Sequence, residues 1–84
     1  MRNEMKKLAH GLIDKGLFFK TRALNGGDQI IVYDEHGLRI WDAVSHAYSY
    51  GGNQGLIEIL GTIVENEDDD VEGWLTAEDI LRRV

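Results

Sequence analysis

Residues 17–41 read LFFKTRALNGGDQIIVYDEHGLRIW, in which three strand-like segments are separated by two turn sequences. The segments are rich in aromatic and β-branched side chains, which favour strands, and they cover residues 17–24, 29–33 and 38–41. Asn25-Gly26-Gly27 supplies the positive φ angles of a tight hairpin, and Asp34-Glu35-His36-Gly37 is typical of a second turn. Two consecutive hairpins predict a three-stranded antiparallel meander.

One face of this meander needs a cover, and the preceding segment is suited to provide it. Apolar residues recur there at intervals of three and four with lysines between them, which predicts an amphipathic helix over residues 3–15. Asn3 is a candidate N-cap for this helix, and Gly16 is a candidate for the residue that ends it. We therefore expect the helix to pack on the sheet.

The C-terminal half predicts further helices. Asp42 is a candidate cap for a short helical turn that runs to Ala47, and residues 48–52 are typical of a loop. A second helix is predicted from Asn53, with one apolar face formed by Leu56, Ile57, Leu60, Ile63 and Val64. A last helix begins at Thr76, where Thr76 and Asp79 have the spacing of a capping box and Leu75 and Ile80 that of a hydrophobic staple. The predicted fold is a single α+β domain over residues 1–84, with the order α-β-β-β-α-α.

Composition restricts the classes of protein to which this chain can belong. Its 84 residues suit one soluble domain with a thin core, and no apolar stretch is long enough to span a membrane. No secretory signal is visible, and there are no cysteines for disulfides or thiolate metal sites. We expect a cytoplasmic protein of a bacterial host cell.

Charge is distributed unevenly along the chain. The net charge is −6, and residues 43–84 contain nine acidic side chains but only two basic ones. Direct binding to DNA or RNA needs a clustered Lys/Arg surface, which the sequence does not provide. A partner bound through electrostatics is therefore expected to have a basic surface.

The most acidic stretch is the first candidate site. Six carboxylates fall within eight residues: Glu65, Glu67, Asp68, Asp69, Asp70 and Glu72. Such a run favours a solvated loop, and three interpretations remain open. In the first, the loop imitates the phosphates of a nucleic acid and occupies a basic groove. In the second, it coordinates a hard cation, although the EF-hand spacing is absent. In the third, it only keeps the protein soluble.

Two tyrosines form the second candidate site. Tyr48 and Tyr50 precede Gly51-Gly52, and tyrosine on a glycine-bearing loop is common at binding interfaces. The alternative is that both rings pack over the edge of the sheet. Trp41 and Trp74, by contrast, are predicted to lie in the core.

The sequence does not indicate catalysis or a cofactor. His10, His36 and His46 lack the spacing that places two imidazoles on one metal, and Ser45 beside His46 is no sign of a nucleophile with its base. No phosphate-binding glycine motif is present. We expect a protein that is not an enzyme and that holds no metal or cofactor.

Residues 48–52, 55–61 and 71–79 (YSYGG, GLIEILG and VEGWLTAED) resemble a group of small acidic proteins of phages and conjugative elements in gut Firmicutes. Element order, length and acid content are also similar to those of small anti-CRISPR proteins that inhibit type II RNA-guided nucleases. Some of those proteins occupy the groove that reads the protospacer-adjacent motif, with Asp and Glu in place of phosphates. The resemblance carries no catalytic motif.

The resulting functional hypothesis is an inhibitor from a mobile element that blocks the basic groove of a nucleic-acid-binding protein such as a CRISPR nuclease. The six carboxylates would meet its Arg and Lys, with Tyr48 and Tyr50 as apolar anchors. Two alternatives stay open. One is a homo-oligomer that buries Leu56, Leu60 and Ile63, and the other is a small metal-dependent hydrolase or nuclease.

Overall fold

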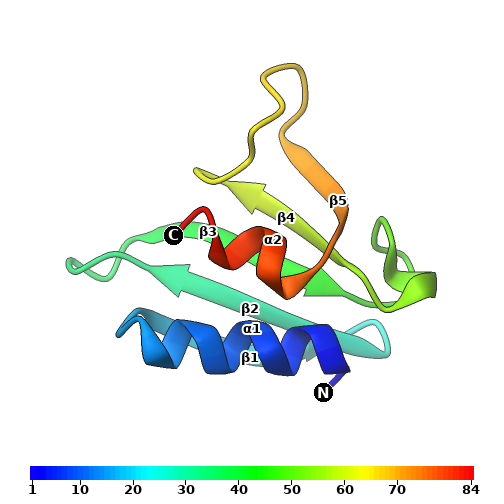
Figure 1. Ribbon diagram of the computed structural model, residues 1–84, viewed down its shortest axis with the longest axis horizontal. Helices are drawn as coiled ribbons and strands as arrows, with labels where there is room; N and C mark the ends of the chain where they lie inside the picture. Colours follow the sequence, from blue (N-terminus) through cyan, green and yellow to red (C-terminus); the bar gives the residue numbers. More distant parts are fainter.

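The computed structural model describes residues 1–84 as two layers, a five-stranded antiparallel sheet with both helices on one of its faces (Figure 1). The strands follow one another in the sheet in chain order. The elements are α1 (Asn3–Asp14), β1 (Phe18–Leu24), β2 (Gly27–Tyr33), β3 (Arg39–Ser45), η1 (Gly52–Gln54), β4 (Ile57–Gly61), β5 (Val71–Leu75) and α2 (Ala77–Leu81). The α+β class is confirmed, but the sheet has five strands rather than three and there are two α-helices rather than three.

The first hairpin forms where the sequence predicts it. Leu24 pairs with Gly27, and the two residues between them, Asn25 and Gly26, have φ angles of 48° and 78°. These left-handed conformations match the twist of the flanking strands, which is why Asn-Gly is favoured there. The hairpin sets a register in which Phe19 lies opposite Val32 on the core face.

Strand β3 is longer than predicted, and the short helical turn expected over residues 42–47 is wrong. Asp42 lies between Ile31 of β2 and Leu60 of β4, so it is paired on both sides. Trp41 and Ala43 point to the core face and are almost completely buried. Hydrogen bonding to two neighbouring strands outweighs the local tendency of Asp42 to begin a helix.

The helix predicted from Asn53 is also wrong. Residues 52–54 make one 3₁₀ turn, and Ile57–Gly61 form strand β4. Ile57 and Ile59 are fully buried, whereas Leu60 faces the other side of the sheet and is half-buried. This alternation has the period of two that defines a strand.

Strand β5 was not predicted, because its sequence overlaps the acidic run. Val71 pairs with Leu60, and Leu75 pairs with Ile57. The register shifts between these two pairs, and Trp74 has a φ of 57° at the shift. Glu72 therefore lies in a strand and not in a loop.

The helices cover the core face of the sheet. Met5, Leu8 and Leu12 of α1 are fully buried, and Gly16 ends this helix as predicted. The N-cap is Arg2 rather than Asn3, and no side chain caps the helix. Neither α1 nor α2 has the length and apolar character of a membrane-spanning helix.

The predicted capping box of α2 is confirmed. The Thr76 hydroxyl accepts the Asp79 N–H at 3.1 Å, and the Asp79 carboxylate accepts the Thr76 N–H at 2.9 Å. Leu75 and Ile80, the predicted staple residues, are both buried. Glu4 of α1 also accepts the Ala77 N–H at 2.8 Å, which joins the two helices.

Candidate partner-binding surface

The acidic stretch forms the connection between β4 and β5, which projects from the body of the molecule at the top of Figure 1. Asn66 organises this connection. Its amide donates to Asp69 Oδ2 at 3.0 Å, and its side-chain oxygen accepts the Asp68 N–H at 3.1 Å. Glu67, Asp68, Asp69 and Asp70 are all exposed.

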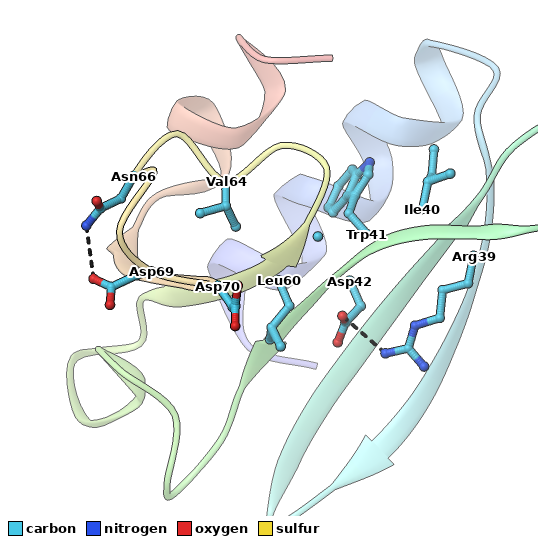
Figure 2. A pocket seen from close by; sticks show the side chains of 10 residues that line it. Arg39, Ile40, Trp41, Asp42, Leu60, Val64, Asn66, Asp69 and Asp70 are labelled. Carbon is cyan, nitrogen blue, oxygen red and sulfur yellow. Dashed lines mark hydrogen bonds and ion pairs between the residues drawn. The ribbon is translucent and has the colours of Figure 1, made fainter.

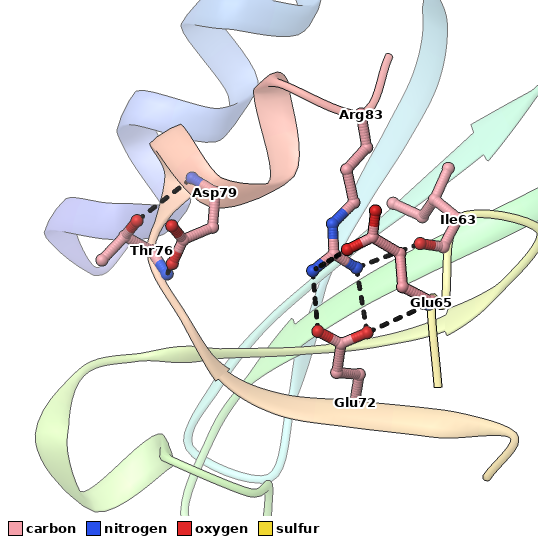
Figure 3. A network of polar contacts seen from close by, with 6 residues as sticks. All are labelled: Ile63, Glu65, Glu72, Thr76, Asp79 and Arg83. Carbon is pink, nitrogen blue, oxygen red and sulfur yellow. Dashed lines mark hydrogen bonds and ion pairs between the residues drawn. The ribbon is translucent and has the colours of Figure 1, made fainter. Parts of the chain in front are cut away.

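Both ends of this acidic loop are held by one arginine, as Figure 3 shows. Arg83 donates to both oxygens of Glu72, at 2.9 and 2.7 Å, and its Nη2 lies 3.1 Å from Glu65 Oε1. It also donates to the Ile63 carbonyl at 3.1 Å, and the Glu65 N–H donates to Glu72 at 3.1 Å. The two chain segments that flank residues 66–70 are therefore fixed to each other.

The six predicted partner-binding carboxylates thus divide into two groups. Glu72, with 23% of its side chain exposed, and Glu65, with 71%, face the protein's own Arg83. Because Arg83 offsets part of their charge, the outward negative field comes mainly from residues 67–70. The sequence did not indicate this pairing, since Arg83 and Glu72 have no helical or turn spacing that would relate them.

Arg83 also affects the protonation of Glu72. The hydrogen bonds from the Arg83 side chain hold the pKa of Glu72 below its ordinary value of 4.5, and the Glu65 N–H adds to the effect. The Ala77 N–H lowers the pKa of Glu4 in the same direction. Both carboxylates are therefore favoured in their charged form in the folded protein.

These shifts predict that the protein loses stability in acid. A carboxyl group whose pKa is lower in the folded state stabilises the fold at pH values above its ordinary, unfolded pKa, and loses this contribution as the pH falls through the folded value. The free energy of unfolding, measured by urea titration, is expected to fall as the pH is lowered below about 4.5. An unchanged or increased stability at pH 3.5 would contradict the assignment.

The two candidate tyrosines occupy different surroundings. Tyr50 stacks on Trp74, with 5.5 Å between ring centroids and an angle of 15° between planes. Tyr48 is exposed and lies edge-on to His46, whose Nδ1 accepts the Tyr48 N–H at 3.0 Å. The structure therefore groups Tyr50 with Trp74, not with Tyr48.

The core assignment is confirmed for Trp41 and wrong for Trp74. Trp41 is 2% exposed, whereas Trp74 is 58% exposed and Tyr50 is 53% exposed. A left-handed backbone conformation costs a residue with a Cβ atom roughly 1–2 kcal/mol, and Trp74 adopts it at the irregularity in β5. Its ring lies at the surface, stacked on Tyr50. A sequence pattern of apolar residues gives no sign of this.

The acidic loop lies between two open clefts. One has a volume of about 510 Å³ and is lined by residues of β3 and β4 together with Asp69 and Asp70 (Figure 2). The other has a volume of about 400 Å³ and lies beside Tyr50 and Trp74. Asn66 and Asp69 line both clefts, so the loop is the wall that they share.

The first cleft contains a carboxylate that is already paired. Asp42 is almost fully buried, lies 3.1 Å from Arg39 and accepts a hydrogen bond from Gln29 at 2.8 Å. Its charge is therefore compensated within the protein. No group of three or more His, Cys, Asp or Glu side chains is arranged to hold a metal ion.

The apolar helical face suggested for self-association does not exist, because the predicted helix is a strand. Leu60 is half-buried on the face of the sheet opposite the helices, whereas Ile63 packs against the core. These two side chains therefore do not form one surface.

Comparisons with models of protein families, with curated proteins and with solved structures found no match.

Proposed function

We propose that this protein is a small acidic binding protein that blocks the basic groove of a nucleic-acid-binding protein, in the manner of an anti-CRISPR inhibitor from a mobile element. The observation that supports this role is the loop of residues 66–70, which presents four exposed carboxylates while Arg83 holds both of its ends. A phosphate mimic needs negative charge in a restricted arrangement, and an acidic loop whose ends are joined supports both requirements.

The contacts of Arg83 with Glu65 and Glu72 are expected to increase the affinity of the loop for its partner. A free loop loses conformational entropy when it binds, and this loss reduces the affinity. Arg83 removes part of that cost before the partner arrives, because it joins Glu65 to Glu72 in the unbound protein. The exposed carboxylates would then steer a basic partner and raise the association rate, an effect that salt weakens.

The test neutralises the loop and compares it with an equal change elsewhere. Asp68→Asn, Asp69→Asn and Asp70→Asn together are expected to weaken inhibition of DNA binding by a guide-loaded type II nuclease at least about tenfold. The domain is expected to remain folded, because exposed loop charges contribute little to stability. Inhibition is measured as displacement of labelled target DNA at two salt concentrations across a panel of such nucleases.

The matched control is Asp14→Asn, Glu35→Gln and Glu78→Gln, which removes the same charge from three exposed sites outside the loop. It is expected to inhibit like the unmodified protein. Equal inhibition by the loop variant would show that the carboxylates do not act as a phosphate mimic. If the unmodified protein displaces DNA from no nuclease of the panel, the nuclease is not the target.

A further inference from the structure

The Tyr50–Trp74 pair is an exposed aromatic surface on two backbone segments that are joined to each other. The Trp74 N–H donates to the Tyr50 carbonyl at 3.2 Å, and the Tyr50 N–H donates to Glu58 Oε1 at 2.8 Å. Gly73 allows the two segments to approach, since a Cβ atom there would lie 2.3 Å from the Tyr50 Cβ. Rings that stack on each other from joined segments have less conformational entropy to lose when a ligand covers them.

The cleft beside these rings combines aromatic faces with acidic oxygens. Besides Tyr50 and Trp74 it is lined by Asn66, Asp69 and Glu72. Glu72 is already paired with Arg83, but the amide of Asn66 engages only Oδ2 of Asp69, which leaves Oδ1 for a ligand. The cleft therefore brings the two stacked rings and a carboxylate oxygen together around one volume of about 400 Å³.

We propose that this cleft binds an arginine side chain of the basic partner. A guanidinium group is planar and weakly hydrated, so it stacks on indole and phenol rings while its N–H groups donate to a carboxylate. An ammonium group satisfies the carboxylate but stacks less well. A nucleic-acid base would also stack, but proteins that bind single strands place basic residues beside their aromatic rings, whereas here the neighbouring side chains are acidic.

This inference rests on the proposed function, because it names the side chain through which the same basic partner is recognised. It adds a short-range contact to the long-range attraction of the loop. The carboxylates of residues 67–70 attract any cationic surface, whereas the aromatic pair distinguishes arginine from lysine.

The two tryptophans make the contact measurable in the intact protein. Trp41 is buried and Trp74 is exposed, so a ligand in the cleft is expected to change the fluorescence of Trp74 alone. The probes are three 12-residue peptides of alternating glycine with arginine, lysine or citrulline, at low salt. The arginine peptide is expected to change the emission and to bind about fivefold more tightly than the lysine peptide, and the neutral citrulline peptide is expected not to bind.

The variant that isolates the aromatic contact is Trp74→Gly. Glycine adopts the left-handed conformation of this position without strain, so the fold is expected to be kept. Calorimetry is expected to show about tenfold weaker binding of the arginine peptide and a smaller change for the lysine peptide. Phe18→Ala is the control, since it removes an exposed aromatic ring from β1 and is expected to change neither affinity.

The possible outcomes separate this inference from the proposed function. Equal binding of arginine and lysine peptides, unaffected by Trp74→Gly, would overturn the arginine site and leave the charge-based mimic intact. A Trp74 response to an oligothymidine but not to the arginine peptide would also overturn it. If no cationic peptide binds, the inference fails, whereas the displacement assay with the nuclease decides the proposed function on its own.

Discussion

Replacing Ile59 by alanine is expected to lower the free energy of unfolding by about 3–4 kcal/mol. Ile59 is fully buried in β4, where it lies opposite Ala43 of β3 on the face that the helices cover. The substitution removes three methyl or methylene groups from the core and leaves a cavity among residues that both sheet and helices hold in place. For a domain of this size the loss is a large part of the total stability.

The neighbouring residue provides the control for this prediction. Leu60→Ala is expected to cost about 1 kcal/mol, because Leu60 is half-buried on the opposite face of the sheet. Urea denaturation followed by circular dichroism measures both values, and Ile59→Val, with an expected cost of about 1 kcal/mol, serves if the alanine variant does not fold. A larger cost for Leu60 than for Ile59 would favour the helical interpretation of this segment over the strand.

The second large effect is expected for Arg83→Met, which removes the charged group but keeps much of the side-chain volume. Arg83 is only 14% exposed and engages Glu72, Glu65 and the Ile63 carbonyl. Without it the partly buried carboxylate of Glu72 lacks its main partner. We expect the free energy of unfolding at pH 7 to fall by about 2–3 kcal/mol.

The adjacent arginine is a matched control. Arg82 pairs with Glu78 at 3.0 Å, but it is 67% exposed, so Arg82→Met is expected to cost a few tenths of a kcal/mol at most. Adding Glu72→Gln to Arg83→Met is expected to restore part of the stability, because it removes the unpaired charge. An equal loss of unfolding free energy for Arg83→Met and Arg82→Met would show that the contacts of Arg83 with Glu65 and Glu72 do not stabilise the fold.

The elements that the sequence predicts correctly are those whose signals are local. The hairpin at Asn25-Gly26, the helix over residues 3–15 and the capping box at Thr76 each depend on neighbouring residues in the chain. The segment Leu56–Leu60 is different, because its apolar residues fit both a helical face and a short buried strand. Pairing with the neighbouring strands β3 and β5 favours the strand over the helix, and the sequence of the segment itself contains no information about that pairing.

The candidate site also combines features that the local sequence predicts with features that depend on the whole fold. The acidic run is a local feature, and the structure leaves five of its six carboxylates exposed, all but Glu72. The partner of Glu65 and Glu72 could not be predicted, since Arg83 reaches them only after β5 and α2 have folded back. The stacking of Tyr50 on Trp74 likewise could not be predicted, because the two residues are far apart in the chain and their segments meet only in the folded protein.

Because Arg83 binds both Glu65 and Glu72, the tip of the loop, residues 66–70, is structurally separate from the rest of the domain. Residues 66–70 bury no side chain in the core, and the segments on either side of them are joined below the tip. The sequence of residues 66–70 is therefore expected to tolerate substitution without loss of the fold that carries it.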